Sequence, residues 1–202
     1  MSPRISPWVM LCVNFGRVAI FSSEQSLWRC EDSGETYSTD EMDMEAFEHV
    51  SRQYRYEHII ILANTETYGG GGIYNSYTLT TTHNPMFKPV VVHEFGHSFG
   101  GLADEYAYTE APSPLYPYHI EPWEQNITTL VDFGSKWKDM VPEGTPIPTP
   151  IKTDKEEIFT SVGVYEGAGY TLKGIYRPVT ECRMKINEAP AFCPVCQRAL
   201  ER

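Results

Sequence analysis

The sequence predicts an α+β fold, in which a twisted mixed sheet supports one central helix and an irregular lobe follows. A continuous apolar run over 58–63 and a β-branched, aromatic run over 74–82 are typical of strands. Apolar residues at helical spacing over 89–99 predict a helix. After position 106, two proline-rich stretches predict long surface loops.

The chain divides into a poorly determined amino-terminal segment, 1–40, and one domain over 41–202. A helix is expected over 40–54, because Asp40 can cap its start and apolar residues follow at helical spacing. The apolar stretch over 8–13 is short and follows two prolines, so no clear signal peptide is expected.

Four consecutive glycines, Gly69–Gly72, lie between the two predicted strands. Glycine loses more backbone entropy on ordering than any other residue, so this run predicts a loop. A phosphate-binding loop is not expected, because no Gly-Lys-Ser/Thr follows the glycines.

The predicted helix carries the most informative stretch, HEFGHSFGGLADEY over 93–106. His93 and His97 lie one turn apart on the same helix face, so both imidazoles can bind one zinc ion with Glu94 beside it. Such a site activates a water molecule, and the glutamate accepts the water proton. The alternative is that both histidines are satisfied polar residues of a buried helix. The carboxylates that follow at Asp104 and Glu105 argue against that alternative.

Together with four other segments, this stretch resembles the M64 peptidases, the IgA-peptidase-like zinc metallopeptidases of Bacteroides-type bacteria. The other matching segments are YEHIIILAN (56–64), YGGGG (68–72), ECRM (181–184) and FCPVC (192–196). The resemblance implies a zincin-like, metzincin-like catalytic domain that hydrolyses peptide bonds of protein substrates with Zn²⁺ as cofactor. It also implies a secreted or cell-surface bacterial protein whose family-typical amino-terminal region is truncated in 1–40.

A catalytic zinc site takes a third protein ligand and keeps its fourth position for water. The metzincin pattern HExxHxxGxxH would place that ligand at position 103, which is alanine here, so Asp104 or Glu105 must supply it. The M64 resemblance implies Asp104, with Glu105 as the alternative. Resemblance to a metzincin-type Met-turn implies that Met184 forms an apolar floor at the zinc ligands, although a lone methionine is usually core.

The predicted strand, residues 73–82 in this role, precedes the active-site helix. In zincin-like peptidases, the strand at this place is an exposed edge that pairs with extended substrate, so we expect main-chain substrate binding here. The residues predicted for this substrate-binding strand are Tyr74, Ser76, Thr78 and Thr80. The alternative is an ordinary sheet strand with no substrate role.

Three of the five cysteines, Cys182, Cys193 and Cys196, lie near the carboxyl terminus. A closed structural zinc site needs four ligands, and only Cys182 lies near the Cys193/Cys196 pair in sequence. A structural role is expected instead, as a disulfide from Cys182 to Cys193 or Cys196 in an oxidising compartment. Redox catalysis is not expected, because no thioredoxin-like pattern surrounds the pair.

Composition limits the partners. With 41% hydrophobic and 13% aromatic residues, the 202-residue chain can bury a core. Its net charge of -11 disfavours nucleic acid and anionic membranes as partners, and no run approaches the roughly 20 apolar residues of a membrane span. A monomer that acts on protein or peptide substrates is expected. The alternative function is a catalytically weak or inactive zinc-containing module, or a fragment, that binds extracellular proteins.

Overall fold

The structure is a computed structural model of the chain. It describes residues 8–14, 17–22, 25–32, 58–63, 66–109 and 115–201, the first three ranges by their backbone alone. The chain forms two compact units, Met1–Phe99 and Gly100–Arg202. The predicted boundary at residue 40 and the predicted helix over 40–54 lie outside the described residues. The division after Phe99 falls inside the segment that the sequence predicts as one domain.

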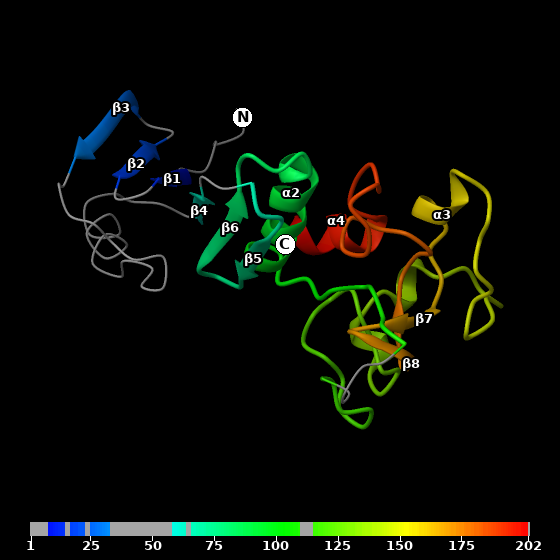
Figure 1. Ribbon diagram of the computed structural model, residues 1–202. Coiled ribbons are helices and arrows are strands. Elements are labelled where there is room, and N and C mark those ends of the chain that lie inside the picture. The colour runs from blue at the N-terminus through cyan, green and yellow to red at the C-terminus, as the bar shows by residue number, and fades with distance from the viewer. Residues whose placement is uncertain are drawn as a thin grey trace, which may run out of the picture. The chain divides into compact units, whose positions relative to one another are not determined.

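The first unit contains a mixed sheet of six described strands in the order β3-β2-β1-β4-β6-β5 (Figure 1). Strand β1 runs parallel to β4, and β4 runs parallel to β6, whereas the other neighbours are antiparallel. The mixed sheet and the α+β class are therefore as predicted. The strands are β1 (Trp8–Asn14), β2 (Arg17–Ser22), β3 (Gln25–Asp32), β4 (His58–Ala63), β5 (Gly70–Ile73) and β6 (Tyr77–Thr81).

Strand β4 explains the apolar run over 58–63. It has a parallel neighbour on each side, and Ile59 and Ile61 are buried. Strands that are covered in this way read as continuous apolar runs rather than as alternating patterns.

The prediction that residues 73–82 form an exposed edge strand is wrong. Strand β6 lies between β4 and β5 and pairs with both of them. Thr78 and Thr80 are completely buried, and Tyr74 and Ser76 lie in the turn before the strand. The outer position in the order of described strands belongs to β5, which the glycine run forms.

The prediction of a loop at Gly69–Gly72 is therefore also wrong for Gly70–Gly72. Helix α2 (Phe87–Ser98) packs against β5 and β6. A Cβ atom on Gly72 would lie 2.2 Å from the Glu94 carbonyl oxygen and 2.7 Å from the His97 Cβ. Glycine is needed because the strand passes so close to the helix backbone, and this packing offsets the entropy that glycine loses in a strand.

We expect Gly72→Ala to destabilise the first unit. The added methyl group meets helix backbone, which cannot move aside as a flexible side chain would, so β5 and α2 must separate. The cost should be about 2 kcal/mol, typical of overpacking. Thermal denaturation measures it, with Gly71→Ala as the matched control because nothing lies within 4 Å of a Cβ there. Equal melting temperatures for the two variants would contradict this account of the glycine run.

Helix α2 matches the predicted helix over 89–99 closely. Pro89 is the third residue of α2, in the first turn, where a missing N–H costs nothing. The helix ends at Ser98, and Gly101 then adopts a positive φ of 58°. A positive φ after the last turn is the usual role of glycine at a helix end.

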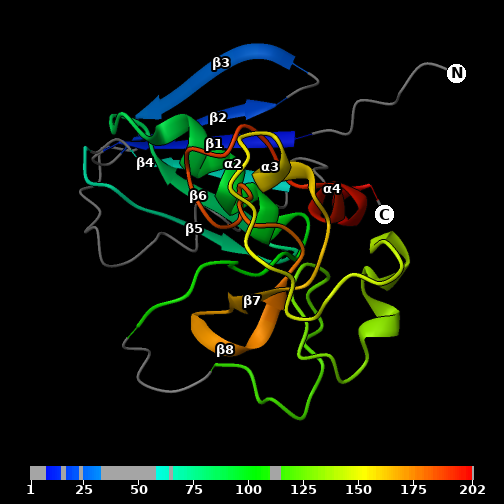
Figure 2. The ribbon, with the colours of Figure 1, turned by 90° about the vertical axis from the view of Figure 1, so that its right-hand side faces the viewer.

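The second unit is largely irregular, as predicted for the lobe after residue 106. Its regular elements are α3 (Glu157–Thr160), β7 (Tyr165–Ala168), β8 (Thr171–Arg177), α4 (Pro194–Leu200) and the 3₁₀ turns Phe133–Ser135 and Lys138–Met140. Strands β7 and β8 form an antiparallel hairpin (Figure 2). Trp137 is buried in the core of this unit, and its indole N–H donates to the Gly163 carbonyl at 2.8 Å.

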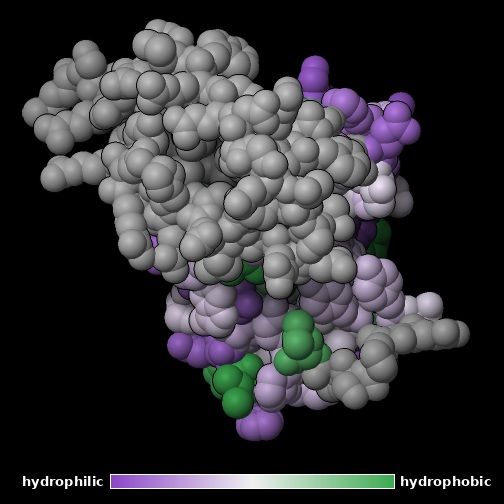
Figure 3. All heavy atoms as spheres, turned by 60° about the vertical axis from the view of Figure 1, so that its left-hand side comes forward, coloured by the Kyte–Doolittle hydropathy of each residue, from purple (hydrophilic) through white to green (hydrophobic). Residues whose placement is uncertain are grey.

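On the face drawn in Figure 3, the hydrophobic residues of the described chain form separate spots among hydrophilic ones. Several exposed apolar side chains belong to the proline-rich stretch, such as Leu115, Tyr118 and Trp123. Isolated exposed apolar residues are normal on a protein surface. Among the described residues, none of the helices has the length and apolar character that crossing a membrane requires.

Candidate active site

His93 and His97 converge as the sequence predicts. Both lie on α2, and their Nε2 atoms are 3.1 Å apart. Two nitrogens that each lie about 2.05 Å from one tetrahedral zinc ion would be about 3.3 Å apart. Both side chains are half-buried, so the pair is accessible and could hold a metal ion.

Glu94 lies with this pair. Ligand atoms of His93, Glu94 and His97 all fall within 4.8 Å of one another. Strand β5 also passes beside the Glu94 side chain, because a Cβ atom on Gly70 would lie 2.8 Å from its Cγ and its Oε1. The glycine run thus leaves room for the carboxylate at the helix surface.

A buried polar group fixes the carboxyl end of α2 to the sheet. The His58 Nε2 atom lies 2.9 Å from the Thr78 hydroxyl and 3.1 Å from the Ser98 hydroxyl. Burial lowers the pKa of His58, which favours the neutral imidazole in these hydrogen bonds. Because Ser98 follows His97 directly, the group holds the helix turn that carries the histidine pair.

In the second unit, two tyrosines hold the Asp104 carboxylate. The Tyr170 hydroxyl donates a hydrogen bond to Asp104 Oδ2, and Tyr106 bonds the same side chain. Burial, together with the Asp104 charge, raises the pKa of both phenols, so they remain donors. Asp104 is itself buried.

Glu105 is held by different partners from its neighbour. It is completely buried, and its Oε1 atom accepts hydrogen bonds from the Asn126 amide at 2.9 Å and the Cys196 thiol at 3.2 Å. Burial raises the pKa of Glu105 well above its usual value, and the nearby Cys182 adds to the effect. Glu105 is therefore engaged by groups of the second unit.

The three carboxy-terminal cysteines come together, but they are not bridged as the sequence predicted. Cys182, Cys193 and Cys196 are all buried free thiols. The sulfur atoms of Cys182 and Cys196 lie 3.7 Å apart, whereas a disulfide requires about 2.05 Å. The Cys196 thiol instead donates to a fourth side chain, with its sulfur 3.2 Å from Glu105 Oε1.

Met184 lies in the core of the second unit. Its side chain is fully buried with Leu102, Trp137 and the cysteines, and its carbonyl accepts a hydrogen bond from the Glu105 N–H at 2.8 Å. Met184 is thus fixed to the residue that follows Asp104. Its predicted role as a floor at the zinc ligands stays a prediction.

The model of the family described as IgA Peptidase M64 matches residues 18–161 and 153–202, far more than half of the chain. The chain belongs to this family. This match confirms the resemblance to the M64 peptidases. M64 is a metallopeptidase family, and membership supports a peptidase that acts on proteins. No curated protein matches the chain.

Sequence reasoning missed several residues of this M64 chain that bear on the site. Gly70 and Gly72 gave a signal, since a glycine run near a predicted helix can also indicate close backbone approach. Tyr170 gave none, because it lies 66 positions after Asp104. The contact of Glu105 with Cys196 spans 91 positions and was equally hidden.

Proposed function

We propose that this chain is a zinc-dependent endopeptidase with a zincin-like catalytic site. The observation that carries the proposal is the convergence of His93 and His97 Nε2 atoms at 3.1 Å beside Glu94, in a chain of a metallopeptidase family. Two imidazoles and one carboxylate suit zinc, since histidine and acidic side chains are its usual ligands at catalytic sites.

Three residues would hold the ion: His93, His97 and Asp104. Asp104 follows His97 by seven positions, and the two carboxylates of the Asp104-Glu105 pair have different partners. Glu105 bonds Asn126 and Cys196, which leaves Asp104 as the candidate for the third ligand. The Tyr106 and Tyr170 hydroxyls orient its carboxylate, as hydrogen bonds to metal ligands commonly do.

When held by these residues, zinc would supply a Lewis acid for the scissile carbonyl and would lower the pKa of water to near neutrality. Glu94 accepts the proton of the attacking water and passes it to the leaving amine. Its carboxylate is suited to this role because it lies with the histidine pair, while His93, His97 and Asp104 supply the three protein ligands of the proposed site. The enzyme would cleave internal peptide bonds of its protein substrates.

An extended substrate would pair with β5 rather than with β6, the strand proposed from the sequence. Strand β5 ends the order of described strands and runs beside the Glu94 side chain. Main-chain hydrogen bonds along such an edge bind a peptide whatever its side chains. Gly71 faces open space, since nothing lies within 4 Å of a Cβ atom built on it. Because glycine has no side chain, a peptide could approach the strand closely there.

Metal removal tests the proposed function. Peptide-library cleavage, read by mass spectrometry, should fall to background after chelation and return when zinc is added, because the site cannot activate water without the ion. The cleaved bonds should lie inside the peptides rather than at their ends. A folded, zinc-loaded chain that cleaves nothing in the library would overturn the proposal and favour a binding module.

A further inference from the structure

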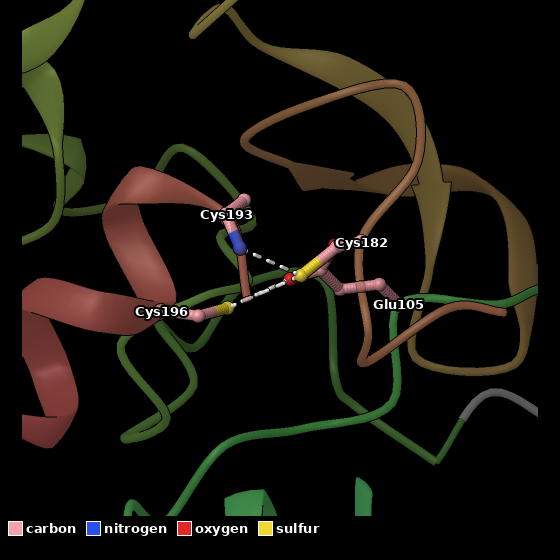
Figure 4. A group of neighbouring side chains, drawn as sticks. All are labelled: Glu105, Cys182, Cys193 and Cys196. Atoms are coloured by element: carbon pink, nitrogen blue, oxygen red, sulfur yellow. Dashed lines mark hydrogen bonds between the residues drawn. The ribbon is translucent and has the colours of Figure 1, made fainter. Parts of the chain in front are cut away.

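Four potential metal ligands converge in the second unit, outside the histidine site. They are Glu105, Cys182, Cys193 and Cys196, and one ligand atom from each lies within 4.8 Å of those of the other three. Figure 4 shows Glu105, Cys182 and Cys196 reaching toward one place from three separate parts of the chain. We call these four residues the cysteine-glutamate cluster.

The spacing within the cluster fits a shared tetrahedral ion. Two sulfur atoms that each lie about 2.3 Å from one zinc ion would be about 3.8 Å apart, and a sulfur and a carboxylate oxygen about 3.6 Å apart. The Cys182 and Cys196 sulfurs are 3.7 Å apart, and the Cys196 sulfur is 3.2 Å from Glu105 Oε1. The sulfur-to-sulfur distance is much too long for a disulfide.

The carboxylate of Glu105 shows that the cluster is more than an apolar core with cysteines in it. Its Oε2 atom is buried and has no hydrogen-bond partner. A buried carboxylate oxygen without a partner is costly, and a cation would supply the missing interaction. The surroundings of the cluster are apolar, with Leu102, Trp137 and Val195 in the same core.

The backbone and nearby charges also suit bound thiolates. The Cys193 N–H donates to the Cys182 sulfur at 3.3 Å, a contact that orients a sulfur ligand. The guanidinium of Arg177 interacts with Glu105, and that of Arg183 interacts with Cys182. Three thiolates and a carboxylate carry more negative charge than one divalent ion offsets, and the two arginines reduce the excess.

We propose that the cysteine-glutamate cluster is a second, structural zinc site, closed by three sulfurs and one carboxylate oxygen. Soft thiolate ligands select zinc over magnesium or calcium. Four protein ligands leave no position for water, which separates this site from the catalytic one. The proposal does not depend on hydrolysis at the histidine pair.

Such a site would join three segments of the second unit. Cys193 caps α4 and Cys196 lies within it, Cys182 lies after β8, and Glu105 directly follows Asp104. The ion would therefore fix the segment that carries Asp104 to the carboxy-terminal helix. Loss of this ion should lower the melting temperature by several degrees, as for other ions that bind only the folded state.

Cobalt substitution of the full chain, reduced and kept free of oxygen, tests the site. Co²⁺ bound by thiolates gives an intense near-ultraviolet charge-transfer band, which a site of histidines and carboxylates does not give. We expect this band in the wild-type protein and in His97→Ala, which disables the catalytic site. Cys196→Ser and Cys182→Ser should each lose about a third or more of the band's intensity, because each removes one of three thiolates, whereas the matched control Cys12→Ser should keep it.

Absence of the band from folded, cobalt-loaded wild-type protein would overturn the proposal, as would its equal loss in Cys12→Ser. If the serine variants do not fold, alkylation of wild-type protein decides the question. Zinc should shield Cys182, Cys193 and Cys196, and chelation should expose them, whereas equal alkylation rates refute the site. Recovery of a Cys182–Cys196 disulfide from freshly purified, zinc-treated protein would also refute it.

Discussion

Glu94→Gln is expected to reduce peptide hydrolysis by about 10²–10⁴-fold, the usual contribution of a general base, while zinc content and melting temperature stay unchanged. The glutamine has the size of the glutamate and can still form hydrogen bonds, but it cannot accept the proton of the attacking water. The substitution leaves both histidine imidazoles in place as ligands, with their Nε2 atoms 3.1 Å apart. The measurement pairs kcat/KM on a cleaved library peptide with metal analysis of the same sample.

Glu66→Gln is the matched control for this experiment. Glu66 is an exposed carboxylate in the same unit, and the same chemical change there should leave kcat/KM unaltered. Near-normal turnover by Glu94→Gln would remove Glu94 from the mechanism. Loss of zinc from a folded Glu94→Gln protein would instead make Glu94 a metal ligand.

The helix and its histidine pair could be predicted because all the information is local. The four-residue spacing of His93 and His97 determines that both lie on one face of any helix they occupy. Pro89 near the start and Gly101 just after the end mark the limits of the same helix. The apolar run of β4 predicted its buried place in the sheet for the same reason.

The place of the glycine run could not be predicted, because it depends on packing rather than on local preference. Chain entropy alone puts Gly70–Gly72 in a loop. Contact with the backbone of α2 makes the same residues a strand, and this displaces β6 from the edge of the described sheet. Local propensity was overridden by a tertiary contact that only glycine permits.

The fourth member of the cysteine-glutamate cluster was hidden for a related reason. The Cys193/Cys196 pair and Cys182 are neighbours in sequence, but Glu105 belongs to the motif of the histidine pair. From the sequence alone, Glu105 is expected at the histidine site, and only three ligands for a closed zinc site lie close together in the sequence. The fold of the second unit brings the missing carboxylate to the thiols.

The contact of Glu105 with the cysteines lets Asp104 and Glu105 be told apart as the third catalytic ligand. We expect Asp104→Ala to abolish hydrolysis and to lower zinc affinity strongly at the histidine site, because two imidazoles alone hold the ion weakly. In the cobalt-substituted variant, the thiolate band should remain, since its ligands are intact. Glu105→Ala should keep zinc at the histidines with activity reduced more mildly, and its thiolate band should shift but persist, because three thiolates remain.

Tyr170→Phe tests the orientation of Asp104 separately from its binding of the ion, because Asp104 itself is unchanged. The change removes only the hydroxyl that donates to Asp104 Oδ2, so zinc should stay bound while kcat/KM falls by about 10–100-fold, as for other partners of metal ligands. Tyr118→Phe is the matched control, because Tyr118 is an exposed tyrosine of the same unit.

If Asp104→Ala keeps full zinc at the histidine site while Glu105→Ala loses it, the third ligand is Glu105. In that case, the tyrosine pair must hold Asp104 for a purpose other than metal binding.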